Sequence, residues 1–325
     1  MLGYIVRRLL ISIPMLIAAT FIFFVIVVWA GNPIGALRSQ PGISPATIKV
    51  REHEYGLDRP VLNRYWDWFT HAIRGDLGTS VHYHEPVTTV LGRAMGVTMR
   101  LVLVATIIGV ILAIAIGVYA AVRQYSVFDY GSTALAFLFF SMPVFWLASV
   151  LSDLAVRINR AVGHRVFFVE GERTPNLSAS VFGHFTDRAG HLILPALTLV
   201  LVSVAGWSRY QRATMLDVLH ADYVRTARAK GLTEFQVIRR HALRNALIPL
   251  VTVVALDFSA VLAGAIVTET VFSWNGMGAL FIEALDNYDV NLLLGWFLIA
   301  ATLVVVFNLA ADVYYGYLDP RIRSA

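Results

Sequence analysis

The residues that could do chemistry in this chain stand out because they interrupt long apolar runs. Asp257 lies near the middle of the run 246–267, and Asp153 lies within the run 133–156. A carboxylate among apolar neighbours is costly to bury, so its presence is a functional hypothesis by default. Asp257 would line a polar path or pair with another subunit, or it would make a structural hydrogen bond inside a helix bundle. The sequence leaves both interpretations open.

A second group of candidates follows the same apolar run. Glu269 precedes the stretch SWNGMG (273–278), which contains Trp274 and Gly276. Glycine permits backbone turns that other residues avoid, so we expect a corner here. Glu269, Trp274 and Gly276 would form a gate or contact a protein that delivers a substrate, and a plain structural turn is the alternative.

Catalytic signatures are missing from the sequence. It contains no GxxxxGK[ST] phosphate-binding loop, no HExxH and no GxSxG, so no motif would cradle ATP or supply a nucleophile. The stretch HYHE (82–85) offers two imidazoles and a carboxylate, but adjacent ligands without supporting partners are weak evidence for a metal. We therefore predict no catalytic residue, no metal site and no cofactor bound by this chain, with 82–85 in a solvated loop.

The composition explains why the acidic residues are conspicuous. Of 325 residues, 58% are hydrophobic and 14% are charged, whereas about 25% charged is usual in soluble domains. A helix needs about 20 mostly apolar residues to cross a bilayer. We predict an all-α polytopic membrane protein with six transmembrane helices, the fourth continuing beyond the bilayer. The apolar runs are 9–30, 101–122, 133–156, 192–208, 246–267 and 292–313.

The distribution of Lys and Arg indicates the orientation of the spans. The densest basic cluster lies at 209–245, whereas 268–291 has no basic residue and four acidic ones. This asymmetry predicts that both termini and 209–245 are cytosolic. The segment 157–191, which is then outside, opposes the rule because it carries five arginines. They are Arg157, Arg160, Arg165, Arg173 and Arg188.

The basic cluster contains the best-defined local pattern of the chain, DYVRTARAKGLTEFQ (222–236). Apolar residues recur at spacings of three and four positions just before and within this stretch: Leu216, Leu219, Tyr223 and Ala227. This periodicity predicts one apolar stripe on a helix.

A tight turn is predicted after this helix. Lys230 would interact favourably with the negative C-terminal end of the helix dipole, and Gly231 tolerates the left-handed conformation just beyond it. Thr233, with Gln236 three residues later, fits a capping box that starts a second helix. The segment would be a basic amphipathic element on anionic lipid, or a rigid docking element for a cytosolic partner. The turn favours docking, because lipid binding does not require a fixed corner.

The same residues resemble a known family. RTARAKG (225–231) followed by ALRNALIP (242–249) is similar to the cytoplasmic EAA loop of ABC importer permeases, in the version typical of the peptide and nickel subfamily. Arg225, Thr226 and Ala227 stand where the general motif has Glu, Ala and Ala, and Gly231 stands at its glycine. Further segments resemble the subfamily, so the likeness covers the whole chain: 55–80, 86–101, 141–148, 191–199 and 269–290.

The resemblance implies a function and a set of partners. The first-subunit, or B-type, permease of an oligopeptide or dipeptide importer would form, with a second similar permease, the membrane path for peptides. Nickel or another solute is the alternative substrate within the family. Two ATP-binding subunits would hold ATP and Mg and grip the cytosolic loop, and an extracytoplasmic peptide-binding protein would dock outside. The chain itself would be a non-catalytic subunit in the cytoplasmic membrane of a prokaryote.

The resemblance also implies a type I importer permease fold and a division of the chain. An N-terminal helix and a large extracytoplasmic loop would occupy 1–97, and a permease domain would occupy 98–325, with the EAA loop at 213–249 between the fourth and fifth helices. The residues expected to contact the ATPase are Tyr223, Arg225, Thr226, Ala227, Lys230, Gly231, Leu232 and Thr233.

A self-sufficient channel or secondary carrier is the alternative from another class. Such a protein would need coupling-ion ligands or a selectivity filter inside the spans, and a few scattered aspartates do not make one. A membrane-embedded hydrolase would need a nucleophile–base motif, which the sequence lacks.

Overall fold

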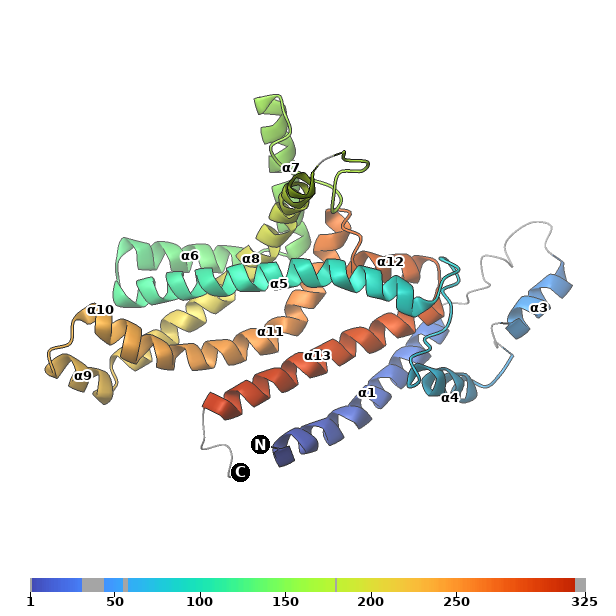
Figure 1. Cartoon of the computed structure of the whole chain (residues 1–325), viewed down its shortest axis with the longest axis horizontal. Helices are drawn as coiled ribbons and strands as arrows, with labels where there is room; N and C mark the ends of the chain where they lie inside the picture. The colour runs from blue at the N-terminus through green and yellow to red at the C-terminus, as the bar shows by residue number, and fades with distance from the viewer. Residues whose placement is uncertain (1, 31–43, 55–57, 179, 319–325) are drawn as a thin grey trace. The chain divides into compact units, whose positions relative to one another are not determined.

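The computed structural model describes residues 2–30, 44–54, 58–178 and 180–318 (Figure 1). In these ranges the chain is helical, and extended pairing is limited to an isolated antiparallel bridge between Thr79 and Pro86. The predicted all-α fold is therefore confirmed. The helices are α1 (Leu2–Ala30), α3 (Pro45–Glu54), α4 (Val61–Ala72), α5 (Val87–Val122), α6 (Val127–Ser141), α7 (Val144–Val162), α8 (Val181–Leu219), α9 (Asp222–Ala229), α10 (Glu234–Gln236), the π-helix η1 (Val237–Ala242), α11 (Leu243–Val271), α12 (Met277–Asp286) and α13 (Val290–Leu318).

Several of these helices are long enough to cross a membrane. Among the described residues, α1, α5, α8, the run from α10 through η1 into α11, and α13 are each long and apolar enough to cross, with a sixth crossing if α6 and α7 form one bent span. Helix α8 extends beyond the predicted run at both ends. Its 39 residues correspond to about 58 Å of helix, roughly twice the hydrocarbon core of a bilayer, so α8 projects outside the membrane.

The third predicted span, 133–156, is divided between two helices. Helix α6 ends at Ser141, and α7 begins after Pro143 at an angle of 106° to it. Met142 is extended, with a ψ of 128°, because the ring of a following proline disfavours the helical region. Pro143 lacks the N–H that an internal helical position would donate, so it stands at the start of α7 instead.

The chain forms two compact units, which are described separately. The larger unit comprises 98–275 and residues from 307 onward, and in it α8 packs against α6, α7 and α11. Small residues allow these helices to approach closely. Helix α5 also approaches α8 closely at Gly117, where a Cβ atom would lie 2.7 Å from the Ser208 carbonyl oxygen and 2.8 Å from Gln211 Cβ.

An ion pair connects two helices of the larger unit. The buried carboxylate of Asp129, near the start of α6, accepts hydrogen bonds from Arg212 Nε at 2.5 Å and Nη2 at 2.7 Å. It also accepts one from the backbone N–H of Tyr125 at 2.9 Å. Two parallel bonds make this a geometrically specific contact, and it fixes α6 against α8.

The smaller unit comprises 2–97 and 276–306. Its apolar core joins α1, α4, the first turns of α5, α12 and α13. Tyr65 of α4 is buried there, and its hydroxyl donates to the Ile17 carbonyl of α1 at 3.0 Å and bonds Thr20 at 2.9 Å.

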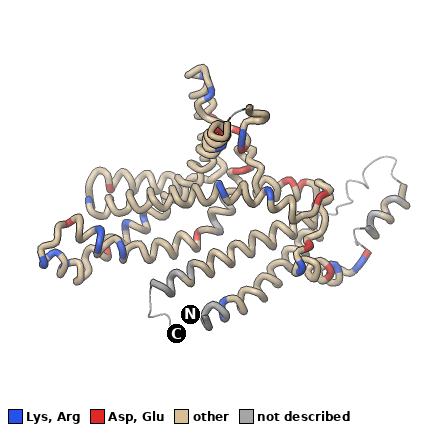
Figure 2. Tube along the Cα trace, viewed as in Figure 1, with Lys and Arg blue, Asp and Glu red and all other residues tan. Residues whose placement is uncertain are grey.

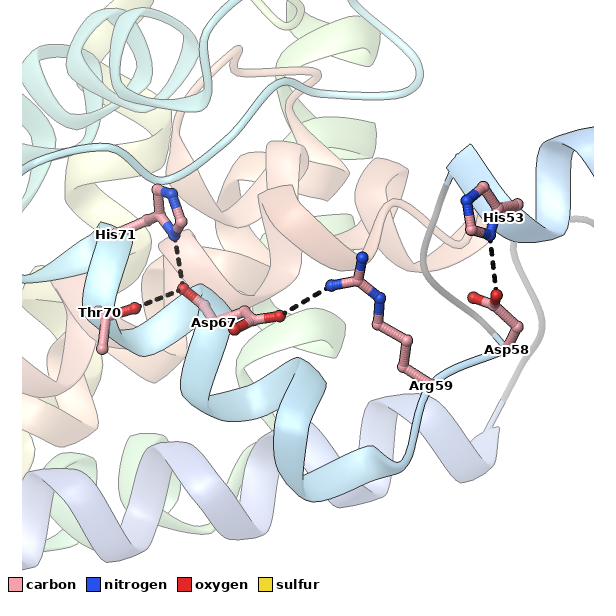
Figure 3. Close-up of polar contacts among 6 residues, drawn as sticks. All are labelled: His53, Asp58, Arg59, Asp67, Thr70 and His71. Atoms are coloured by element: carbon pink, nitrogen blue, oxygen red, sulfur yellow. Dashed lines mark hydrogen bonds and ion pairs between the residues drawn. The ribbon is translucent and has the colours of Figure 1, made fainter.

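Polar contacts order the exposed surface before and along α4 (Figure 3). The Asp58 carboxylate bonds His53 Nδ1 at 2.8 Å, and this hydrogen bond lowers the pKa of Asp58 below its ordinary value. Arg59 reaches the Asp67 carboxylate, eight residues further on, at 3.2 Å. All four side chains are substantially exposed, so these pairs orient the segment more than they stabilise the fold.

The loop before α5 is attached to the start of α13 by a buried carboxylate. Asp289 caps α13 by accepting from the Leu292 N–H at 3.1 Å. Its other oxygen accepts from the Ser80 hydroxyl at 2.5 Å and the His82 N–H at 3.1 Å. Tyr83 donates to Glu283 at 2.5 Å, and burial together with this bond raises the pKa of Tyr83. The predicted solvated loop at 82–85 is therefore partly packed against acidic residues.

The close approach at Gly117 predicts a stability effect. We expect Gly117→Ala to destabilise the protein by about 1–3 kcal/mol, because the methyl group would overlap the Ser208 carbonyl and force α5 from α8. Thermal unfolding in detergent, followed by tryptophan fluorescence, measures the change. Gly206→Ala on α8 is the matched control, since nothing lies within 4 Å of its Cβ position. Equal melting temperatures for both variants would contradict this packing.

The Asp289 contacts predict a local effect on the loop. We expect Asp289→Ala to cost about 1–3 kcal/mol and to release 80–86, because it removes a helix cap and leaves the Ser80 and His82 donors without their acceptor. Amide hydrogen exchange at 80–86 measures the release. Asp286→Ala, at an exposed neighbouring position, should leave exchange unchanged. Unchanged exchange in Asp289→Ala would show that other contacts hold the loop.

Candidate functional site

The predicted docking element lies between α8 and α11, at the end of both helices (Figure 1). We call residues 220–242 the corner. Helix α8 ends at Leu219, and α9 starts only at Asp222, so Leu216, Leu219, Tyr223 and Ala227 do not share one helix. The predicted single stripe is wrong in this respect, because the chain turns at 220–221 and rotates the faces of α9.

A small apolar cluster holds the corner together. Val224 and Ala227 on α9 are buried against Val237 of η1, with Leu232 partly buried beside them. Tyr223, in contrast, is 44% exposed. Burying side chains on both arms of the turn fixes the angle between them, since neither arm can move without exposing apolar surface.

The turn itself has the predicted local structure. Lys230 ends α9, and Gly231 follows with a φ of +80°, a conformation that glycine adopts without steric cost. Thr233 then starts α10 with a capping box, in which its backbone N–H donates to Gln236 Oε1 at 3.2 Å. These features, predicted from residue types alone, are confirmed.

An ion pair crosses the turn. Arg228 donates to Glu234 from Nη2 at 2.7 Å and from Nε at 3.1 Å, and it also reaches the Leu219 carbonyl at 3.3 Å. The hydrogen bond with Glu234 raises the pKa of Arg228. Both side chains are more than a third exposed, so screening limits the pair to less than about 1 kcal/mol. It adds to the fixed shape of the turn without dominating it.

The outer face of the corner presents polar and basic groups. Two of the residues expected to contact an ATPase, Ala227 and Leu232, belong to the apolar cluster. The other residues of that set are exposed. Figure 2 shows Lys and Arg gathered at this end of the unit, whereas the long helices carry few charges. The exposed expected contacts are Tyr223, Arg225, Thr226, Lys230, Gly231 and Thr233.

The corner is firmly connected to the spans. Ala242 of η1 and Ala246 of α11 are buried with Met215 of α8 and Ala121 of α5. Within η1 the backbone is wound more widely than in an α-helix, and the Leu243 N–H donates to the Ile238 carbonyl. Such π-turns often mark functional segments. A displacement of the corner would therefore be carried into α8 and α11.

Asp257 lies on α11, well away from the corner. Its carboxylate is half-buried and accepts a hydrogen bond from Trp207 Nε1 of α8 at 2.8 Å. Asp257 thus makes a structural contact between two helices, and its role in lining a path stays a prediction. Asp153 is exposed on α7 and pairs with Arg157 one turn later at 2.8 Å.

The predicted gate residues lie around the end of α11. Glu269 is fully buried and accepts a hydrogen bond from Thr98 Oγ1 at 2.5 Å. The buried Trp274 is brought back to it by a turn, in which the Trp274 N–H donates to the Glu269 carbonyl at 2.7 Å. Gly276 stands at the start of α12. Asp257, three turns earlier, is not part of this group.

Two polar contacts of buried carboxylates were not predicted from the sequence. The Asp129–Arg212 pair joins residues 83 positions apart, and the Ser80–Asp289 bond joins residues 209 positions apart. No local pattern marks either pair, because each forms only when distant helices meet. The one available signal is an acidic residue beside an apolar run, which applies equally to acids without such partners.

Comparison with known proteins connects the geometry to a family. Residues 113–324 match the family described as "Binding-protein-dependent transport system inner membrane component". Residues 1–102 match the one described as "Binding-prot-dependent transport system membrane comp, N-term". A solved structure of the MetNI methionine ABC transporter in inward-facing conformations has a TM-score of 0.55 at 16% identity, covering 71% of this chain and 96% of that chain. That likeness concerns the fold alone.

Curated relatives match along the full length. The oligopeptide transport system permease protein OppB of Mycobacterium tuberculosis is 41% identical over 324 residues, 99% of each chain. AppB of Bacillus subtilis, also named for oligopeptide transport, is 40% identical over 99% of this chain and all of its own. The dipeptide permease DppB of Escherichia coli K12 is 38% identical over 99% of each. This chain belongs to the family of inner membrane components of binding-protein-dependent transport systems.

Proposed function

We propose that the chain is a permease subunit of an ATP-driven importer and that it forms, with a second similar permease, the membrane path for peptides. The names of its full-length relatives support a peptide substrate. Oligopeptides are the first class to test and dipeptides the second. Nickel or another solute is the alternative within the same family.

The rigid corner is the observation that carries this proposal. A surface that receives force from a partner must keep its shape, and here an apolar cluster, a glycine turn, a capping box and an ion pair fix one short segment. The exposed face of this segment is basic, as suits docking on a partner with acidic side chains. A lipid-binding helix would need only an amphipathic face, without the fixed turn.

The corner would act by biasing two arrangements of the spans. ATP binding to partner subunits would favour one position of the corner over the other, which is what a ligand must do to shift a conformational equilibrium. Because Met215 of α8 and Ala246 of α11 share one cluster with η1, both helices would follow. Packed helices transmit such movements as rigid elements.

The partners and the membrane topology are part of the same proposal. Two ATP-binding subunits would hold ATP and Mg and perform the hydrolysis, so this chain would be non-catalytic and would bind no cofactor. Both termini and the corner would face the cytosol of a prokaryotic cell, and 163–191 and 272–289 would lie outside. An extracytoplasmic peptide-binding protein would dock on the outer side.

A self-sufficient channel or secondary carrier is the second candidate. It would use polar groups within the spans, and Asp257 and Glu269 are the relevant ones. Each already accepts a hydrogen bond, from Trp207 and Thr98 respectively, which favours structural roles. Transport that persists without ATP would support this candidate against the importer.

Reconstitution tests the importer directly. The chain is co-expressed with the second permease and the ATPase subunits, purified, and placed in proteoliposomes with the binding protein inside or outside as orientation requires. We expect labelled oligopeptide to accumulate only with ATP and Mg. If no ATPase co-purifies and uptake continues without ATP, the importer function is wrong; uptake of nickel but not peptide would correct the substrate.

Gly231 provides a sharper test of the corner. A side chain in the left-handed region costs about 1–2 kcal/mol, and a β-branched one fits it poorly. We therefore expect Gly231→Val to shift the turn and lower peptide-stimulated ATP hydrolysis by about tenfold. ATP hydrolysis by the purified complex is the measurement.

Gly163→Val is the matched control for Gly231→Val. Gly163 ends α7 with a φ of +77°, and nothing lies within 4 Å of either Cβ position. The two substitutions thus introduce the same backbone strain at two helix ends. If they reduce coupling equally, general destabilisation explains the effect; if Gly231→Val has no effect, the corner does not transmit force.

A further inference from the structure

A pocket in the segment between α7 and α8 has no role in the function proposed above. It has a volume of about 930 Å³. The loop 171–177 forms one wall, the first two turns of α8 form another, and Asn275 closes one side. All lining residues except Asn275 belong to 157–191, the segment that carries the five arginines opposing the usual charge distribution around a membrane.

The base of the pocket is held in place by buried polar groups. Asp187, 8% exposed, accepts from the Thr174 N–H at 2.8 Å and from its hydroxyl at 2.6 Å. The buried His191 bonds the Gly171 carbonyl at 2.9 Å through Nδ1. Phe168 lies so close to α8 that a Cβ on Gly190 would be 2.6 Å from its ring. The wall is therefore preorganised, which reduces the entropic cost of binding.

The charges around the pocket are unbalanced. Its acidic members are already engaged, Asp187 with Thr174 and Glu172 with Arg100 at 3.4 Å. Arg173, His184 and Arg188 are exposed, and no residue in the described ranges forms an ion pair or side-chain hydrogen bond with them. The pocket thus offers cationic groups to a ligand that carries carboxylates.

Exposed apolar side chains lie at the start of α8, and two of them, Val181 and Phe185, line the pocket. Val181 is 89% exposed, Phe182 74% and Phe185 69%, all at the start of α8. Aromatic side chains beside arginine are typical of the energetically important centres of protein interfaces. The combination fits a partner surface with an apolar centre and acidic neighbours.

The position of these apolar side chains favours a protein over lipid. The apolar run of α8 starts at Leu192, 11 positions after Val181, which corresponds to about 16 Å of helix. A headgroup layer is roughly 5–8 Å thick on each side of the hydrocarbon core. For a helix that crosses the membrane near the normal, Val181 and Phe182 lie beyond the headgroups.

We propose that this pocket docks an acidic segment of the extracytoplasmic binding protein, with Arg173 and Arg188 contacting its carboxylates and Phe185 its apolar side chains. The inference rests on the proposed importer function. Docking here would also reach α11, because the Gly171 N–H donates to the Phe272 carbonyl at 2.9 Å just after that helix ends. The occupant of the pocket would therefore contact the segment that follows Glu269.

Charge reversal in the complete importer tests this site. The wild-type and variant complexes are placed in lipid nanodiscs, and the affinity for purified binding protein is measured by interferometry at low and high salt. We expect Arg173→Glu and Arg188→Glu each to weaken binding at least about tenfold, and high salt to weaken wild-type binding. Arg160→Glu, exposed on the same segment but outside the pocket, is the matched control and should stay within about twofold.

Two further measurements secure the interpretation. Phe185→Ser changes an exposed side chain without altering charge, and it should weaken binding at least about fivefold while size-exclusion profiles stay unchanged. An acidic residue of the binding protein changed to Arg should restore affinity to Arg188→Glu, which identifies the opposing carboxylate.

Specific results would overturn the docking site. If all three arginine variants weaken binding equally, the binding protein responds to the overall positive charge of this surface and not to the pocket. If none of them weakens binding, it docks on another surface. Loss confined to nanodiscs that contain anionic lipid would assign the pocket to a lipid headgroup. Loss of labelled peptide binding in the absence of the binding protein would assign it to the substrate. If wild-type complex neither binds the binding protein nor imports peptide, the proposed function fails; if it does both and the variants match it, the inference alone fails.

Discussion

A backbone amide inside a bilayer has no water to bond, and the rest of this structure follows from that constraint. It explains why the apolar runs are helical. It also limits where the helices can be interrupted. At the bend between α6 and α7 the Met142 N–H still donates to the Phe139 carbonyl, whereas the turns at 220–221 and 230–233 lie in the polar corner.

The same constraint governs the side chains. The carboxylates of Asp129, Asp257 and Glu269 each accept a hydrogen bond from another helix or its flanking residues, donated by Arg212, Trp207 and Thr98. Removing a donor would leave a carboxylate without its partner, which costs more than the contact contributes when intact. These acids thus fix the register of the helices, and any role in transport is added to that one.

Helix α11 places two distant features on one rigid element. It begins where η1 leaves the corner, and its 29 residues correspond to about 43 Å. Just beyond its other end, the Phe272 carbonyl accepts a hydrogen bond from Gly171, in the loop that forms one wall of the pocket. In the proposed importer, one helix would therefore run from the ATPase-facing corner to the surface that receives the binding protein. A packed helix suits this role because it moves as a unit rather than deforming.

Local features of the sequence determined the class of fold and the chemistry of the turn. Length and hydropathy gave the membrane helices, and Gly231, Thr233 and Gln236 gave the corner, because left-handed backbone and helix caps depend on residues within a few positions. Pro143 could have been used to divide the third run, since its effect on Met142 is equally local. The apolar stripe through Tyr223 was misplaced because periodicity does not reveal a turn that rotates the next helix.

Only the tertiary structure decided which distant residues meet. Asp129 and Arg212, or Ser80 and Asp289, are ordinary polar residues until helix packing brings them within hydrogen-bonding distance. The pocket between 171–177 and the start of α8 is of the same kind: the sequence shows five arginines in 157–191, but only the fold shows that Glu172 and Asp187 are engaged while Arg173 and Arg188 remain exposed. Pattern along a chain determines which elements form; contact between elements determines which of their charges are left to bind a partner.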